Sequence, residues 1–230
     1  MILENINNVN KNIRIACENS GRSPKDITLI AVSKTKPVSL LEEAYLAGCR
    51  HFGENKVQEL CDKYEVMEQD IQWHMIGHLQ TNKVKYLIGK TTLIHSVDSY
   101  KLACEIEKQA AKQDCIMDIL IEVNIANEES KFGLAKDEVI SLVKEISQLP
   151  HVRIQGLMTV APYVENPEEN RMHFRNIKKL SVDIDNQNID NVNMNILSMG
   201  MTGDYMVAIE EGATIVRVGT GIFGERNYMK

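Results

Sequence analysis

The sequence alternates strictly between short apolar segments and longer amphipathic segments, and this alternation constrains the fold more than any other feature. After a polar-faced helix over residues 1–20, it predicts eight strands with seven helices between them. Such alternation requires right-handed crossovers and a parallel sheet. The strands are predicted at residues 27–34, 51–55, 71–77, 92–97, 117–125, 153–160, 195–200 and 215–219, and the helices at 39–47, 56–68, 81–88, 99–112, 136–148, 167–182 and 205–211.

Eight repeats favour a closed (β/α)8 barrel of the TIM type over an open, doubly wound sheet. The open sheet would need a phosphate-binding glycine loop after the first strand, and residues 34–37 contain no glycine. We therefore expect an α/β barrel with an extra N-terminal helix, forming a single domain over residues 1–230. The asparagine-rich stretch 183–195 is predicted to be an exposed loop before the seventh strand.

Composition excludes several classes of protein. The net charge of −6, with acidic and basic residues interspersed, argues against nucleic acid as the main partner. The five cysteines are odd in number and widely spaced, which favours neither a disulfide framework nor a zinc site. The chain has no apolar run long enough for a signal peptide or a membrane span. We expect a cytoplasmic protein without metal and without a membrane partner.

Lys34 is the last residue of the first predicted strand. The apolar run of this strand covers residues 27–32. A strand that is apolar on both faces is buried, and the carboxyl ends of barrel strands form the ligand-binding mouth. Desolvation there lowers the pKa of a lysine, so Lys34 is a candidate Schiff-base amine. The alternative is a strand-end lysine that only reaches solvent.

Two later strand ends have the composition of an anion site. Ser198-Met199-Gly200 ends the seventh strand, and Gly219-Thr220-Gly221 follows the eighth. Barrels often bind phosphate at these two loops, although glycine there can also serve turn geometry alone. Arg217 in the last strand is either a ligand contact or part of a salt bridge at the rim. For His74, His78 and Glu54 we predict hydrogen-bonding or structural roles rather than acid–base chemistry.

A buried lysine, a phosphate cradle and an arginine between them suit pyridoxal 5'-phosphate (PLP). The sequence also resembles the pyridoxal phosphate homeostasis proteins, the YggS/PROSC family, from the N-terminal helix to the last residues. The motifs that carry this resemblance lie at residues 31–37 (AVSKTKP), 52–59 (FGENKVQE), 73–83 (WHMIGHLQTNK), 156–158 (GLM), 197–201 (LSMGM) and 216–224 (VRVGTGIFG).

The resemblance implies the barrel of the N-terminal domain of alanine racemase, with PLP held as an aldimine on Lys34. It implies that Lys36 assists exchange of the cofactor or binds it secondarily, and that Arg217 faces the pyridine nitrogen. The segment 202–206 departs from the serine- and acid-rich helix start usual in the family. By the same resemblance, the residues that line the cofactor or contact its phosphate are Asn55, Ser198, Met199, Gly200, Gly219 and Thr220.

Two functions compete for this site. One is a PLP enzyme resembling an amino-acid racemase; the other is a protein that takes part in PLP homeostasis by buffering or delivering the cofactor without substrate turnover. Racemisation needs a second base opposite Lys34, which similar racemases take from an additional β domain, and the chain ends at Lys230 soon after the eighth strand. We therefore expect a monomeric carrier, with PLP-requiring apo-enzymes as possible recipients.

Overall fold

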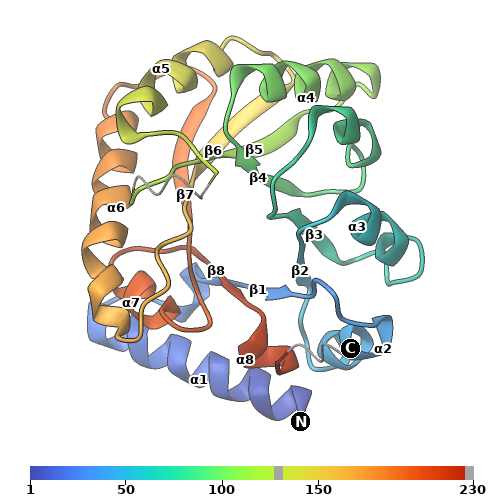
Figure 1. Cartoon of the computed structure of the whole chain (residues 1–230), viewed down its shortest axis with the longest axis vertical. Coiled ribbons are helices and arrows are strands. Elements are labelled where there is room, and N and C mark those ends of the chain that lie inside the picture. Colours follow the sequence, from blue (N-terminus) through green and yellow to red (C-terminus); the bar gives the residue numbers. More distant parts are fainter. Residues whose placement is uncertain (127–131, 226–230) are drawn as a thin grey trace.

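A closed barrel of eight parallel strands, surrounded by helices, forms the described part of this computed structural model, residues 1–126 and 132–225 (Figure 1). Each strand pairs with the next in sequence, and β1 pairs with β8 to close the barrel. The predicted (β/α)8 fold is thereby confirmed. The strands are β1 (Thr28–Val32), β2 (His51–Glu54), β3 (Gln72–Met75), β4 (Leu93–Val97), β5 (Met117–Glu122), β6 (Val152–Met158), β7 (Val192–Met201) and β8 (Ile215–Val218).

The helices cover the outside of the barrel, and the apolar core lies between them and the strands. A smaller apolar cluster, containing Ile30, Leu120 and Met158, comes from alternate strand positions, as expected for side chains inside a barrel. The helices are α1 (Ile2–Ser20), α2 (Val38–Leu46), α3 (Val57–Tyr64), α4 (Tyr100–Lys112), α5 (Lys136–Ile146), α6 (Arg171–Asp185), α7 (Tyr205–Glu210) and α8 (Thr220–Phe223).

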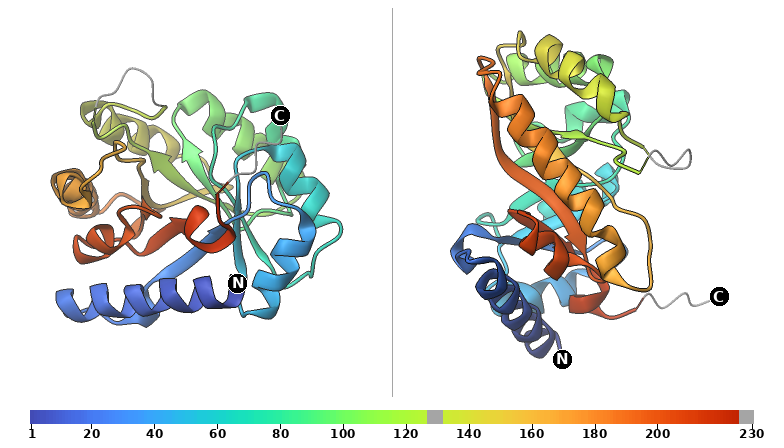
Figure 2. Two further views of the ribbon diagram at one scale, coloured as in Figure 1. Left: turned by 60° about the horizontal axis from the view of Figure 1, so that its bottom comes forward. Right: turned by 90° about the vertical axis from the view of Figure 1, so that its left-hand side faces the viewer.

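The predicted extra helix is α1, which lies along the outside of the barrel beside α7 and α8 (Figure 2). Its buried face contains Ile2, Ile6, Val9 and Ile13, a helical spacing of three to four residues. Gly21 ends the helix in the left-handed conformation, with φ of 67°. The first helix of the chain therefore packs on the last two and covers the seam where β1 meets β8.

Several segments differ from the expectation. The helix predicted at 167–182 begins as a 3-10 helix, Pro167–Asn170, before α6. Residues 81–88 contain a 3-10 helix, Thr81–Tyr86, in place of an α-helix. Strand β7 begins at Val192 and not at residue 195, because buried Met194 alternates with exposed Asn193 and Asn195 in the pattern of a half-buried strand. The predicted loop over 183–195 therefore shrinks to residues 186–191. The short helix α8 after the last strand was not predicted.

None of the helices in the described part of the chain combines the length and the apolar character that a bilayer crossing requires. All five cysteines are free thiols.

Candidate functional site

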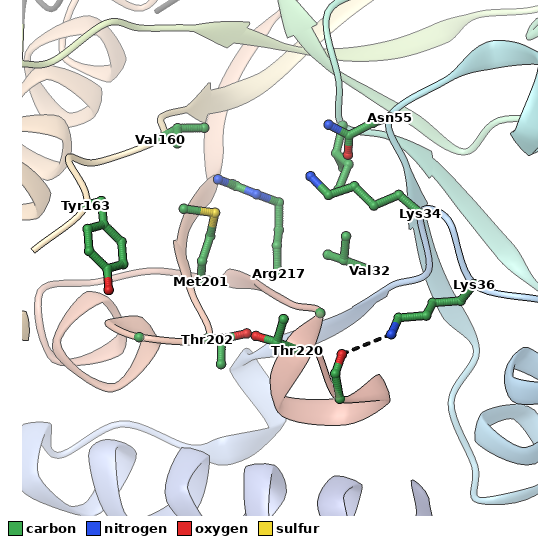
Figure 3. Close-up of a pocket in the computed structure, with 14 residues that line it drawn as sticks. Val32, Lys34, Lys36, Asn55, Val160, Tyr163, Met201, Thr202, Arg217 and Thr220 are labelled. Atoms are coloured by element: carbon green, nitrogen blue, oxygen red, sulfur yellow. Dashed lines mark hydrogen bonds between the residues drawn. The ribbon is translucent and has the colours of Figure 1, made fainter. Parts of the chain in front are cut away.

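A pocket of about 570 Å³ opens at the carboxyl ends of the strands, where barrels bind their ligands. Six of the residues selected from the sequence line it, and Figure 3 shows Lys34, after β1, and Arg217, in the neighbouring strand β8, both reaching into it. The lining residues are Val32, Lys34, Lys36, Asn55, Ile76, Val160, Tyr163, Met201, Thr202, Gly203, Arg217, Gly219, Thr220 and Gly224.

Lys34 lies in the turn that follows β1, and both of its neighbours are tied down. The hydroxyl of Ser33 donates to Oε1 of Glu54 at 2.6 Å. The amide of Thr35, a residue with φ of 64°, donates to Oε1 of Glu59 at 2.6 Å. A β-branched residue seldom adopts a positive φ, so these contacts hold the backbone in a conformation that it would otherwise avoid.

Beneath this turn, a buried cation joins the same carboxylates. Nζ of Lys63 lies 2.7 Å from Glu54 and 2.8 Å from Glu59, and it also donates to the carbonyl of Ser33 at 2.8 Å. Burial raises the pKa of Glu54, and its bond to Lys63 opposes that rise. Glu54 therefore has the structural role that we predicted, and it fixes the backbone on the amino side of Lys34.

Arg217 is buried in β8, the strand next to β1, and its side chain lies beside Lys34 in the pocket (Figure 3). Its guanidinium donates to the hydroxyl of Ser198 at 2.7 Å and to the carbonyl of Thr159 at 2.9 Å. Among the described residues it forms no salt bridge, so the rim ion pair considered for it is absent from that part of the chain. Burial lowers the pKa of Arg217 to about 10, which still leaves the side chain charged at neutral pH.

Asn55 follows β2 and also lines the pocket. Its Oδ1 atom is buried, and no described residue hydrogen-bonds to it. Gly77 permits this position, because a Cβ added there would lie 2.5 Å from the carbonyl oxygen of Asn55. A buried amide oxygen without a partner at a pocket wall is an acceptor that a ligand can satisfy.

The loops after β7 and β8 form the lower side of the pocket in Figure 3, with Thr202 on one loop and Thr220 on the other. The amide of Gly221 donates to the hydroxyl of Thr202 at 3.4 Å, which joins the two loops. Asp204 shapes the first loop by accepting from the amide of Met201 at 2.7 Å. Two hydroxyls beside glycine backbone suit a small anion such as a phosphate group.

Ser198, Met199 and Gly200 lie in β7, one step before this loop, and their side chains do not line the pocket. Ser198 is buried beneath Arg217, and Met199 packs in the core outside the barrel. Gly200 has φ of 88°, and a Cβ there would lie 2.6 Å from Ala208. That these three residues contact a phosphate remains a prediction.

Lys36 points to the far end of α8. Its Nζ donates to the carbonyls of Phe223, Gly224 and Glu225 at 3.2, 3.0 and 3.0 Å (the bond to Gly224 is drawn in Figure 3). An ammonium group has three hydrogens, so these contacts use its whole donor capacity. Lys36 thereby connects the turn that carries Lys34 to the helix that begins at Thr220.

Part of the pocket wall was not predicted from the sequence, and His78 lies outside this pocket. Val160, Tyr163, Met201 and Gly203 line the wall beside Thr202. The signal that could have found them is their position, since Met201 ends the seventh strand and the other three follow the sixth or the seventh. The ring of His78 stacks on Phe132 with 4.0 Å between the ring centres. It lines a neighbouring pocket that meets the first one at Asn55.

Comparison with known proteins places the chain in a family. A model of the alanine racemase N-terminal domain matches residues 5–227. A pyridoxal phosphate homeostasis protein of Aquifex aeolicus is 48% identical over 226 residues, which is 98% of this chain and 98% of the relative. This chain belongs to the pyridoxal phosphate homeostasis protein family. Another member, from Escherichia coli, is 37% identical over 234 residues, which is 100% of this chain and 98% of that protein.

Solved structures agree with this family assignment. PipY of Synechococcus elongatus, solved with PLP bound, is 32% identical with a TM-score of 0.82, and the match covers 97% of this chain and 100% of PipY. An alanine racemase of Clostridium difficile is 14% identical with a TM-score of 0.74, and the match covers 95% of this chain and 58% of the racemase. The racemase shares the barrel fold, and the resemblance that the sequence motifs indicated is confirmed.

Proposed function

We propose that this protein binds PLP with Lys34 as its covalent anchor and takes part in PLP homeostasis by buffering or delivering the cofactor. One observation carries the proposal. A single pocket brings together a lysine amine, a buried arginine and a pair of hydroxyl-bearing loops. The PLP-bound structure of PipY, a relative with the same fold, supports it.

The residues present fit this cofactor. When bound, PLP supplies an aldehyde with which a lysine amine condenses reversibly, releasing water. Lys34 is the lysine that points into the pocket, whereas Lys36 is engaged with the carbonyls at the end of α8. The buried Oδ1 of Asn55 and the guanidinium of Arg217 offer an acceptor and a donor at the ring end.

We assign the ends of the ligand from these positions. Arg217 donates to the pyridine nitrogen and Asn55 lines the ring. Gly219 and Thr220 bind the phosphate, together with Thr202 and the backbone of residues 198–200. A cation at the ring nitrogen disfavours its protonation, and this weakens the stabilisation of a carbanion that amino-acid chemistry would need.

A racemase needs a second base fixed opposite Lys34, and the described pocket wall offers little for that role. Among the described lining residues, Tyr163 is the remaining candidate for such a base. This residue is 95% exposed, and its side chain lies at the edge of the pocket in Figure 3. A base must be held within hydrogen-bonding reach of the proton that it removes. This geometry favours a carrier over an enzyme.

For Lys36 we propose a role in exchange that acts through α8. Its three bonds to the end of α8 hold the helix whose first residue is Thr220. Releasing them would loosen the phosphate side of the pocket while Lys34 keeps its position. We further propose that the carrier is a cytoplasmic monomer and that PLP-requiring apo-enzymes receive the cofactor.

The absorption spectrum of the purified protein tests the anchor. With PLP added, the wild type should show a yellow band, and borohydride should fix the cofactor on the peptide that contains Lys34. Lys34→Ala should lack both, whereas the matched control Lys25→Ala, at an exposed lysine, should retain them. A wild type that stays colourless with added PLP would overturn the cofactor assignment.

A second experiment separates the carrier from the racemase. The PLP-loaded protein is incubated with single enantiomers of several amino acids, and the enantiomer ratio is followed over hours. The carrier predicts no Lys34-dependent change in this ratio, together with recovery of activity when a PLP-requiring apo-enzyme is mixed with the loaded protein. Rapid Lys34-dependent racemisation would contradict the proposal.

A further inference from the structure

Three histidines inside the barrel form a hydrogen-bonded column that ends at Arg217. Nδ1 of His51 lies 3.0 Å from Nε2 of His74, and Nδ1 of His74 lies 3.0 Å from Nε2 of His95. Nδ1 of His95 lies 2.9 Å from the hydroxyl of Ser198, which accepts from Arg217 at 2.7 Å. His74, His95 and Ser198 are buried, whereas His51 is half-buried at the start of β2.

The column meets a buried charge that has no counter-ion among the described residues. Among the described residues, the two hydrogen-bond acceptors of the Arg217 guanidinium are neutral, the hydroxyl of Ser198 and the carbonyl of Thr159. Glu122 and Asp204 act on Arg217 only through space, without a salt bridge in the described part of the chain. Burying a cation in this way is costly unless polar groups around it are oriented to stabilise it.

The donors and acceptors available determine the direction of each hydrogen bond in the column. Because a guanidinium only donates, the Ser198 hydroxyl accepts from Arg217 and must pass its own hydrogen to another acceptor. At hydrogen-bonding distance, the described residues offer Nδ1 of His95. A neutral His95 then carries its hydrogen on Nε2 and donates to His74. By the same argument His74 donates from Nε2 to Nδ1 of His51.

Burial keeps the column neutral, as this arrangement requires. It lowers the pKa of His74 to about 3, with a smaller contribution from His51. It also lowers the pKa of His95, with further contributions from His74 and Arg217, and the pKa of His51. In each neutral ring the acceptor nitrogen then faces Arg217 and the N–H bond points away from it. The negative ends of three aligned dipoles are therefore directed at the guanidinium.

We propose that His51, His74 and His95 are positioning residues for Arg217. Their hydrogen bonds all donate in the direction away from Arg217, and this column stabilises the charge of Arg217 and fixes its guanidinium without a carboxylate. A carboxylate would neutralise Arg217 and compete for its donors, whereas neutral rings leave the positive charge directed at the pocket. Only one part of this proposal rests on the proposed function, namely that the ring of PLP lies against Arg217.

The tautomers of the three histidines test the proposal directly. The wild-type protein, with and without PLP, is labelled with ¹⁵N in its histidines, and long-range proton–nitrogen spectra are recorded between pH 6 and 8. Signals are assigned from their loss in His51→Gln, His74→Gln and His95→Gln. All three rings should be neutral and carry hydrogen on Nε2. A ring that carries hydrogen on Nδ1, or that is charged at pH 7, would contradict the proposed direction of the hydrogen bonds.

Affinity for PLP gives a second readout. In His95→Phe the Ser198 hydroxyl loses its acceptor, so we expect the dissociation constant for PLP to rise about tenfold and the absorption maximum of the bound cofactor to shift. The control is His151→Phe, at a half-buried histidine that bonds Glu107 outside the column, and it should match the wild type. Unchanged affinity and absorption in folded His95→Phe contradict the positioning role. Absence of PLP binding to the wild type would instead contradict the proposed function. The tautomers would then still test the direction of the hydrogen bonds between the histidines.

Discussion

Replacing His74 with glutamine should make the stability of the protein less dependent on pH. The pKa of His74 is about 3 in the folded protein and 6.5 for an unperturbed histidine, so between these values only the unfolded chain binds the proton. A lowered folded pKa contributes stability that is complete above about pH 6.5 and is lost as the pH falls towards 3. Between pH 7 and pH 5 this linkage removes about 2 kcal/mol from the free energy of unfolding.

Other groups titrate in the same range, and the comparison is designed to cancel them. Burial, followed by the charge of Asp98, raises the pKa of Glu122 to about 7, and burial raises that of Glu54. A raised carboxyl pKa works in the opposite direction, because the folded protein then holds a proton that the unfolded chain has released. Both carboxyls are present in the wild type and in His74→Gln, so their contributions cancel in the difference.

The assay is urea denaturation of the cofactor-free proteins, followed by circular dichroism at half-unit steps from pH 5 to pH 7. Glutamine has a donor and an acceptor on one side chain and can bond both neighbouring histidines. The stability advantage of the wild type over His74→Gln should shrink by about 2 kcal/mol from pH 7 to pH 5. An advantage that stays constant across this range would refute a neutral, buried His74.

Three further substitutions test other contacts. Lys36→Met should raise the rate of PLP release about tenfold while borohydride still fixes the cofactor on Lys34, and an unchanged rate would count against the role of α8. Lys63→Met leaves the buried carboxylate of Glu54 without its cation and should cost about 3–5 kcal/mol in urea denaturation; a loss below about 1 kcal/mol would contradict this. Gly156→Ala places a Cβ 1.8 Å from the carbonyl oxygen of Ile196, on the next strand, at φ of +152°. We expect the free energy of unfolding to fall by about 3 kcal/mol or more, and a wild-type melting temperature would show the reasoning to be wrong.

The architecture and the outline of the pocket could be predicted from the sequence because both depend on local patterns. Apolar runs and amphipathic stretches determine strands and helices, and eight strands in alternation with helices lead to a closed barrel. Once the barrel is assumed, the ends of its strands place Lys34 and Asn55 on the same rim as the loop that contains Thr220. The motifs that resemble the family then indicated PLP as the cofactor and Lys34 as the residue that holds it.

Contacts between distant strands could not be predicted in the same way. His51, His74 and His95 lie more than twenty residues apart, and each alone indicates only a hydrogen-bonding residue. Their column depends on the register with which neighbouring strands pair around the barrel, which hydrophobic periodicity does not specify. The same holds for Lys36, whose acceptors at the end of α8 follow it by almost the whole length of the chain.

The pairing of β1 with β8 has a consequence for how the protein is made. Lys34 follows the first strand and Thr220 follows the last, so the two sides of the pocket meet only when the barrel closes. A growing chain therefore lacks the complete pocket until its final strand has left the ribosome, and the contacts that close the barrel are among the most distant in the sequence. A ligand that bridges the two sides binds only the closed form and stabilises the seam against opening. Bound PLP, the ligand proposed for this pocket, should therefore protect the closed barrel from proteolysis.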